Sequence, residues 1–250
     1  MEPTKQRPCA IESNDHAECP FFVKIAAACM DEHQLPQKRK RGRPDKQEYC
    51  FQRSPFTPSG KFNSCESLDV LYSIRPRKKW STMTRYRSFV LHHIKYGSGD
   101  FVYVANDRSL SQEDAAKKDS DQMCELHWIA KILEIRALDD THIYARVYWM
   151  YLPDDLPENT LDGQKVVSGR QPYHGQRELM ASNHMDIINV NSIVGQATVD
   201  QWMEFKEKSE ENQAQGVLYW RQALDYLTRQ LSVYASHSLT PFSFLCYFNH

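Results

Sequence analysis

The sequence lacks closely spaced cysteines. Its seven cysteines are scattered through 250 residues and never form a CxxC pair. They are Cys9, Cys19, Cys29, Cys50, Cys65, Cys124 and Cys246. This distribution indicates neither a disulfide framework nor a zinc ribbon, so we expect a reduced, intracellular protein that binds no metal and no other cofactor.

Long hydrophobic runs and an excess of one charge are lacking as well. The longest apolar stretch, around residues 21–30, is far too short to span a membrane, and the N-terminus carries no apolar signal run. The 31 basic and 32 acidic residues nearly balance. This balance argues against uniform coating of nucleic acid but leaves room for a local basic patch. We therefore expect no membrane partner.

The sequence also lacks the residue arrangements of an enzyme. Histidines are plentiful, yet none has a recognisable spacing from a nucleophile or a metal ligand. The acidic pairs at 139–140 and 154–155 are typical of turns. We therefore expect a protein without catalytic residues, without a metal site and without a small-molecule substrate.

Residues 1–66 form a tail that we expect to be mostly disordered, because it is rich in Pro, Ser, Lys and Gln and shows little periodicity. It contains a basic cluster made of Lys38, Arg39, Lys40, Arg41 and Arg43. Such a cluster favours nuclear import or DNA contact, and its Arg-Gly-Arg-Pro core is similar to a minor-groove AT-hook. A solvated basic linker is the alternative. We expect a nuclear protein with nucleosomal DNA as a partner of this tail.

Residues 127–151 predict a β-hairpin, because two runs alternate apolar with polar or long side chains around an acidic turn. If the turn is centred on the acidic pair, Trp128 faces Tyr151 and Ala130 faces Trp149. Side chains repeat with a period of two along a strand, so the three aromatic rings emerge on one face. They are expected to converge around the gap left by Ala130.

Three converging rings have two interpretations. Aromatic faces bind quaternary ammonium groups, such as trimethyl-lysine, through cation–π attraction. Alternatively, the rings are part of an ordinary hydrophobic core. The other face of the hairpin is also apolar and is a second candidate for the core; it carries Ile129, Leu133, Ile135, Tyr144, Tyr148 and Met150.

The remaining chain predicts a mainly β protein. Several short strands separated by turns indicate a small antiparallel β-barrel over residues 89–202. Residues 67–88 carry aromatic side chains at a spacing that suits packing onto this barrel. Within an extension at 203–231, a helix is expected from Gly216 to Leu231, because apolar residues fall on one stripe. Residues 232–250 are expected to form an irregular tail.

Several motifs together resemble the BAH (bromo-adjacent homology) domain, in the form found in fungal and plant Polycomb-pathway chromatin readers. The motifs are Trp128-Ile-Ala-Lys-Ile132, Val147-Tyr-Trp-Met-Tyr151, Tyr173-His-Gly-Gln-Arg-Glu-Leu179, Ser182-Asn-His-Met-Asp186 and Ile193-Val-Gly195. Fungal relatives often continue into a zinc-binding PHD finger. Here the sequence after Leu231 has one cysteine and no CxxC pair, so we expect no such finger.

The resemblance implies a methyl-lysine cage formed by Trp128, Trp149 and Tyr151. It also implies that His184 and Asp186 contact the histone peptide. Asp155 is expected at the cage rim, where its charge would favour the ammonium group, with a solvated loop position as the alternative. In the same way, Gly175 and Glu178 are expected to be structural, the first in a turn and the second bonded to backbone.

Two functions follow from this resemblance. The first is non-enzymatic reading of trimethyl-lysine on the histone H3 tail, at the Polycomb mark on lysine 27, with a role in gene silencing. The second is a protein–protein or nucleosome-docking module without methyl-lysine recognition, in which the basic tail and the patch at Arg75–Lys79 contact phosphate. Burial of any cage ring against the barrel would favour the second function.

A first prediction concerns localisation. Replacing the basic residues at 38–43 with alanine should abolish nuclear accumulation, because exposed basic clusters are read by import receptors. Imaging of a fluorescent fusion checks this. A fusion that stays nuclear after the replacement would place the import signal elsewhere.

Overall fold

In the computed structural model of the chain, the described residues are 19–26, 49–57, 62–63, 67–106, 123, 127–202 and 217–234. The basic cluster at 38–43 and the tail beyond residue 234 lie outside them. Within the described parts, no helix is long and apolar enough to cross a membrane.

The described chain is mainly β-structure, as predicted, with short helical elements. Its strands are β1 (Phe22–Ile25), β2 (Cys50–Gln52), β3 (Phe62–Asn63), β4 (Val70–Arg75), β5 (Thr84–Tyr86), β6 (Ser88–Leu91), β7 (Ile94–Gly97), β8 (Phe101–Val104), β9 (Trp128–Ala137), β10 (Ile143–Met150), β11 (Thr160–Asp162), β12 (Lys165–Val167), β13 (Glu178–Ser182), β14 (Met185–Asn189), β15 (Ile193–Ala197), β16 (Val199–Gln201), β17 (Leu218–Asp225), β18 (Gln230–Leu231) and β19 (Val233–Tyr234). The helical elements are α1 (Arg77–Thr82), η3 (Pro153–Asp155) and η4 (Val190–Ser192).

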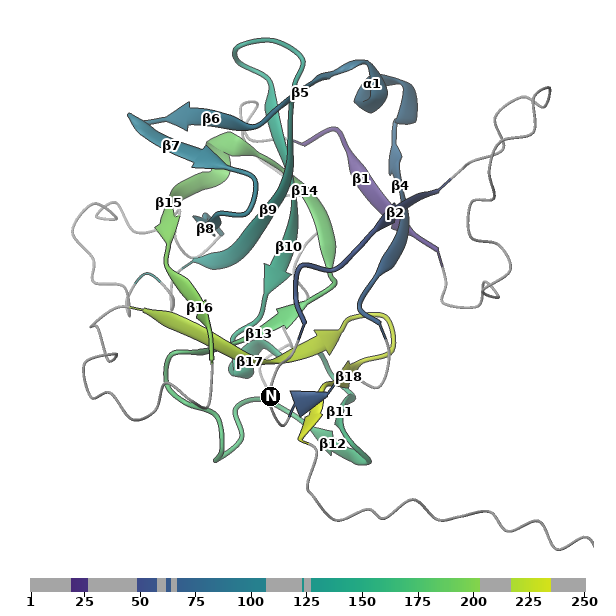
Figure 1. The fold of residues 1–250 in the computed structure, drawn as a ribbon, viewed down its shortest axis with the longest axis vertical. Coiled ribbons are helices and arrows are strands. Elements are labelled where there is room, and N and C mark those ends of the chain that lie inside the picture. The colour runs from purple at the N-terminus through teal and green to yellow at the C-terminus, as the bar shows by residue number, and fades with distance from the viewer. Residues whose placement is uncertain are drawn as a thin grey trace, which may run out of the picture.

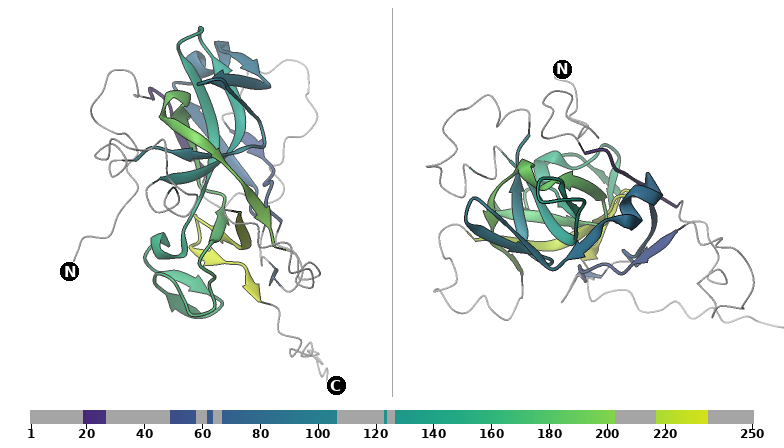
Figure 2. Two further views of the ribbon diagram at one scale, coloured as in Figure 1. Left: turned by 90° about the vertical axis from the view of Figure 1, so that its left-hand side faces the viewer. Right: turned by 90° about the horizontal axis from the view of Figure 1, so that it is seen from above.

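The central sheet has the strand order β14-β10-β9-β8-β15, and β5 also pairs with β9. A second sheet, β12-β11-β18-β17-β13, lies at the lower end of the molecule (Figure 1) and pairs β16 in parallel with β17. Strands β1, β4 and β2 form a third sheet beside the first. Figure 2 shows the same arrangement from two further sides, with the central sheet strongly curved.

The predicted closed barrel is wrong. Among the described strands, the central sheet runs from β14 to β15 without these two edges pairing. The reason is that β10 is buried on both faces, so each face needs its own cover. Tyr148 and Met150 pack in one core with Phe21 and Val70 of the N-terminal strands. Trp149 packs in the second core, together with Tyr151 and Leu224.

The expectation of a mostly disordered tail over residues 1–66 is wrong for three segments, because β1, β2 and β3 lie within it. Strands β1 and β2 both pair with β4, which lies about twenty or more residues further along the chain. Just before β1, Phe21 is buried, with its ring centroid 5.2 Å from Trp80 and 5.1 Å from Tyr144. These contacts are distant in sequence, so local composition could not reveal them.

The predicted helix over Gly216–Leu231 is also wrong, because the chain forms β17, a turn and β18 there. Every second residue of β17 from Leu218 to Leu224 is buried. β17 pairs in parallel with β13, with Glu178 opposite Tyr219 and Ser182 opposite Leu224. The spacing of the apolar residues fits both a strand with a period of two and an amphipathic helix. The segment forms a strand because the edge of β13 is available for pairing.

The hairpin of β9 and β10 has the predicted antiparallel pairing but a different turn. Near the turn, Glu134 lies opposite Arg146, one residue out of the predicted register. A bulge follows, and Trp149 then lies opposite Ala130, as predicted. The loop is longer than two residues, and the extra residue in β9 at Leu133 restores the register.

A buried ion-pair cluster fixes this register. Arg146 donates to Glu134 from Nε (3.2 Å) and Nη2 (3.1 Å), and Arg136 Nε donates to the other carboxylate oxygen at 2.8 Å. Burial opposes ionisation of Glu134, but the two arginines outweigh it and hold the pKa of Glu134 below its usual value. A one-residue slip of the hairpin would separate these charges in the core.

A second prediction distinguishes the observed strand from the predicted helix. Both Leu224 and Leu227 lie on the helical stripe, but Leu224 is fully buried while Leu227 is 40% exposed. Leu224→Ala should lower the free energy of unfolding by about 2–5 kcal/mol, and Leu227→Ala should change it by less than about 1 kcal/mol. Urea denaturation of the two variants checks this. Equal losses would support a docked helix.

Candidate functional site

The hairpin places two indole rings against each other. Trp149 on β10 lies directly opposite Ala130 on β9, which is fully buried. Trp128, two residues before Ala130, points its ring to the same side. The ring centroids of Trp128 and Trp149 are 5.6 Å apart at an interplanar angle of 77°. The two rings therefore pack edge to face, nearly perpendicular to each other.

Tyr151 extends the same face beyond the end of β10. Its backbone N–H and C=O exchange hydrogen bonds with Met180 of β13, at 2.9 and 2.8 Å. This bridge links the central sheet to the second sheet at the site. The Tyr151 hydroxyl lies 2.7 Å from Nδ1 of His184, so the position of the phenol ring is fixed at both ends.

A stack of three rings continues from Tyr151. The rings of His184 and Tyr226 are 3.8 Å apart between centroids and nearly parallel at 5°. Tyr151 stacks with both, at 6.1 Å from His184 and 6.3 Å from Tyr226. Arg229 covers Tyr226 with its guanidinium carbon 5.0 Å from the ring centre. Tyr226 is a site residue that sequence reasoning missed, because it was placed in a helix and off its apolar stripe.

The segment Ser182–Asp186 holds the site together. Ser182 Oγ donates to the Trp149 carbonyl at 2.6 Å. Asn183 Oδ1 accepts from the Tyr226 backbone N–H at 2.8 Å, and its amide donates to Asp225 at 2.9 Å. Both side chains are buried, so their hydrogen bonds are made in a low-dielectric environment. This short motif thus fixes Trp149 from one side and the turn carrying Tyr226 from the other.

Asp186 places a carboxylate behind the indole of Trp149. Its Oδ2 accepts from Trp149 Nε1 at 3.4 Å, and its Oδ1 accepts from the Ile187 N–H at 2.8 Å. Burial raises the pKa of Asp186, and these two donors oppose that rise. The carboxylate is therefore a poorly hydrated acid that a nearby cation would stabilise.

The rings differ in exposure. Trp149 and Tyr151 are each 3% exposed, and both belong to the core under β17. Trp128 is half-buried and packs against this core from its edge. Asp155 lies on η3 with an exposed side chain. The structure thus brings Trp128, Trp149, Tyr151, His184 and Asp186 together, and among the described residues no hydrogen bond or ion pair joins the Asp155 side chain to them.

The segment that carries Gly175 and Glu178 binds to Arg221 of β17 and not to the aromatic rings. Glu178 is fully buried and accepts from the Gly175 N–H at 2.8 Å, which confirms its predicted bond to backbone. Arg221 of β17 binds the same carboxylate through Nε at 2.8 Å and through Nη2. Gly175 is required by close approach, because a Cβ there would overlap the Tyr219 hydroxyl. This ion pair joins β13 to β17.

Metal ligation has no support in the described part of the chain. It contains no group of three or more His, Cys, Asp or Glu side chains that could hold an ion. The chemistry available at the site is that of aromatic faces, one imidazole and one half-buried carboxyl group. This set suits a cation with an apolar surface.

Among solved structures, the chain is similar to the yeast Rsc2 BAH domain, with 16% sequence identity and a TM-score of 0.39 over 57% of this chain and 51% of that chain. The chain therefore spans about half the length of that structure. The search of curated proteins found no match.

The BAH domain family matches residues 94–234. The matched region is more than half of the chain and contains both sheets that meet at the site, including β17 and β18. On the strength of this match, the chain belongs to the BAH domain family.

Proposed function

We propose that this chain is a chromatin-binding protein that reads trimethyl-lysine on the histone H3 tail, with lysine 27 as its target. BAH domains are generally non-catalytic, chromatin-associated modules. The observation that carries the finer proposal is the perpendicular pair of indoles, Trp128 and Trp149, with Tyr151 on the same face. In this proposal the protein is nuclear and acts in gene silencing, as in the Polycomb-pathway readers that its motifs resemble.

The rings suit a trimethylammonium group for electrostatic reasons. Each ring presents a negative face, and a cation over it gains about 0.5–2 kcal/mol depending on how far it is desolvated. Asp186 lies beside the indole N–H of Trp149, and its half-buried carboxylate group would attract a cation bound near these rings. Unmodified lysine keeps a tightly held hydration shell, so it gains less from the same rings.

Trp128 has a distinct role in this proposal. Trp149 and Tyr151 are buried and hydrogen-bonded to Asp186 and His184, and Trp128 is the half-buried ring at the edge of the core. A turn of the Trp128 ring away from Trp149 would open a space between them. The methylated side chain then takes the space over Ala130, with His184 and Asp186 beside the peptide.

The burial of Trp149 and Tyr151 favours a second candidate function. At 3% exposure each, the two rings also suit a purely structural role in the core. The protein would then be a protein–protein or nucleosome-docking module without methyl-lysine recognition. The two candidates differ in one measurable property, which is discrimination between methylated and unmodified peptide.

A third prediction tests the proposed function. Trp128→Ala should weaken binding of a trimethylated lysine-27 peptide by about 1–2 kcal/mol, or roughly 5- to 30-fold, through loss of one cation–π contact. Trp202→Ala is the matched control, because Trp202 is also half-buried but packs on Tyr219 instead, 5.0 Å between centroids. Titration calorimetry with trimethylated and unmodified peptides checks this. Equal affinity of the wild-type protein for both peptides would leave the docking function in its place.

A fourth prediction concerns Asp186. A carboxyl group whose pKa is raised by folding stabilises the fold below its unfolded pKa, near 3.9, and this contribution is lost as pH rises through its folded pKa. Asp186→Asn cannot ionise, so its stability relative to wild type should improve as pH rises from about 3 to 7. Its affinity for trimethylated peptide at pH 7 should fall. Denaturation at several pH values checks the first claim, and a pH-independent difference would contradict it.

A further inference from the structure

A long segment of the chain contains no acidic residue. Between Asp69 and Asp100 the sequence has seven basic residues and neither Asp nor Glu. The basic residues are Arg75, Arg77, Lys78, Lys79, Arg85, Arg87 and Lys95. Since the whole chain is nearly neutral, this segment is a strong local departure from its average.

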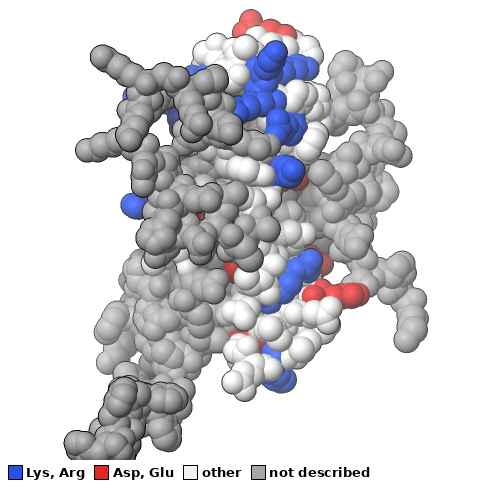
Figure 3. All heavy atoms as spheres, turned by 90° about the vertical axis from the view of Figure 1, so that its right-hand side faces the viewer, with Lys and Arg blue, Asp and Glu red and all other residues white. Residues whose placement is uncertain are grey.

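The fold gathers this charge at one end of the molecule. The segment begins with β4, which leads upward to α1, and continues into β5, β6 and β7; α1 and these three strands lie at the upper end in Figure 1, away from the second sheet. In Figure 3, Lys and Arg side chains gather over the upper part of one face, while acidic side chains lie at its tip and at separate places lower down. Arg77, Lys78 and Lys79 are all exposed on α1. Charge that is dispersed along the sequence therefore becomes one basic surface.

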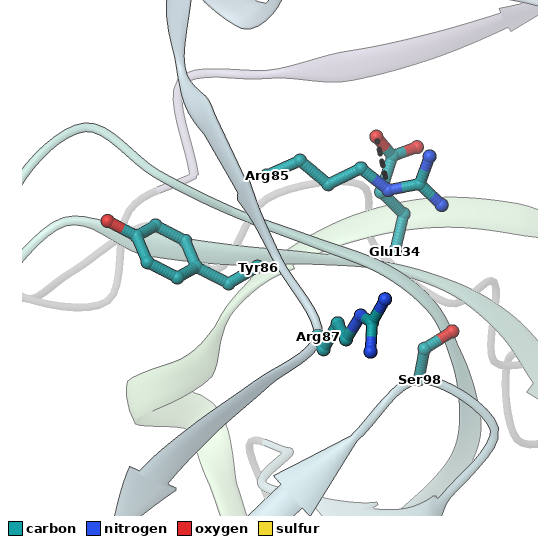
Figure 4. A pocket seen from close by; sticks show the side chains of 5 residues that line it. All are labelled: Arg85, Tyr86, Arg87, Ser98 and Glu134. Carbon is teal, nitrogen blue, oxygen red and sulfur yellow. Dashed lines mark ion pairs between the residues drawn. The ribbon is translucent and has the colours of Figure 1, made fainter.

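A pocket of about 500 Å³ lies within this surface, beside β5. Its lining is Arg85, Tyr86, Arg87, Ser98 and Glu134. Figure 4 shows the side chains of Arg85 and Arg87 on one side of β5 and the ring of Tyr86 on the other. The exposed Tyr86 ring points away from both arginines, so the pocket offers two guanidinium groups to an incoming group.

Glu134 does not cancel the charge of these arginines. Its two oxygens already accept from Arg136 and Arg146, at 2.8 and 3.1 Å, whereas Arg85 Nε lies 3.8 Å away on a side chain that is 68% exposed. One carboxylate thus faces three guanidinium groups. Among the described residues, no ion pair involves Arg87. The pocket consequently has a net positive charge.

We propose that this basic surface binds the phosphate backbone of duplex DNA, with Arg85 and Arg87 holding one phosphate and the basic side chains of α1 contacting others. Guanidinium groups bind phosphate in a two-pronged geometry. Contacts of this kind, together with hydroxyl and aromatic contacts to sugar, make up most protein–DNA contacts and carry no sequence information. The binding is therefore expected to be independent of sequence.

The surface is separate from the aromatic site and does not depend on its proposed ligand. None of the pocket residues belongs to the ring cluster of Trp128, Trp149, Tyr151, His184 and Tyr226. A chain that holds a histone tail at one place and DNA at another would gain affinity from both contacts at once. DNA is thus a partner that suits a chromatin module whichever function the rings serve.

A fifth prediction tests this surface with charge reversals. Arg87→Glu and Arg77→Glu should each weaken binding of a non-specific duplex at low salt at least several-fold. Each should also reduce the slope of log affinity against log salt by about 1, since each removes a phosphate contact. Lys165→Glu is the matched control, because Lys165 is exposed on β12 at the opposite end of the molecule and the charge change is the same. Fluorescence anisotropy of the full chain gives these affinities.

Two further measurements separate the sources of binding. The same reversals are made in a full chain whose basic residues at 38–43 are alanine, so that contacts of the tail are removed. Affinity for trimethylated peptide should be unchanged by Arg87→Glu, and affinity for DNA should be unchanged by Trp128→Ala. Equal DNA affinity of Arg87→Glu, Arg77→Glu and Lys165→Glu would overturn the proposal. Salt-dependent binding of poly-glutamate but not of duplex would overturn it in favour of an acidic protein partner.

Discussion

The structure depends on the buried ion pair between Glu134 and Arg146. These residues are direct cross-strand partners, so their contact fixes the pairing of β9 with β10. Arg146 also donates to Gln52 at 2.7 Å and lies over the ring of Tyr72 at 4.7 Å. The same guanidinium therefore attaches the N-terminal sheet to the hairpin. A charge pair of this kind is costly to break because either partner alone would be left buried and uncompensated.

Register is what connects this pair to the aromatic site. The bulge at Leu133 lies directly beyond Glu134 and shifts the pairing by one residue. Without it, Trp149 would lose its place opposite Ala130, and the two indoles would no longer pack edge to face. The site thus rests on two adjacent features of one strand, a buried carboxylate and an inserted residue. The second sheet then adds the stack of His184 and Tyr226.

The sequence allowed prediction of the hairpin, the mainly β class and the convergence of Trp128 with Trp149, because alternation over a long hairpin is a local signal. The predicted pairing of Trp149 with Ala130 is correct, although it was based on a two-residue turn that the structure does not have. The bulge in β9 shifts the register by one residue and so compensates for the longer loop. Strand β17 was not predictable, because its apolar spacing fits either period. Tyr226 and the N-terminal strands depend on partners far along the chain, which a single sequence does not reveal.

The position of Tyr226 has a consequence for how binding and folding are linked. The three aromatic rings Trp128, Trp149 and Tyr151 lie within residues 128–151, but the ring of Tyr226 that stacks on Tyr151 comes from the turn between β17 and β18. A fragment that ends before β17 would keep all three rings and lose their support. Because the site forms only in the folded assembly of both sheets, any ligand that occupies it raises the stability of the whole domain, and above its Kd this gain grows with the logarithm of the ligand concentration. Thermal stabilisation of the intact chain is therefore a readout of ligand identity that requires no label on the peptide.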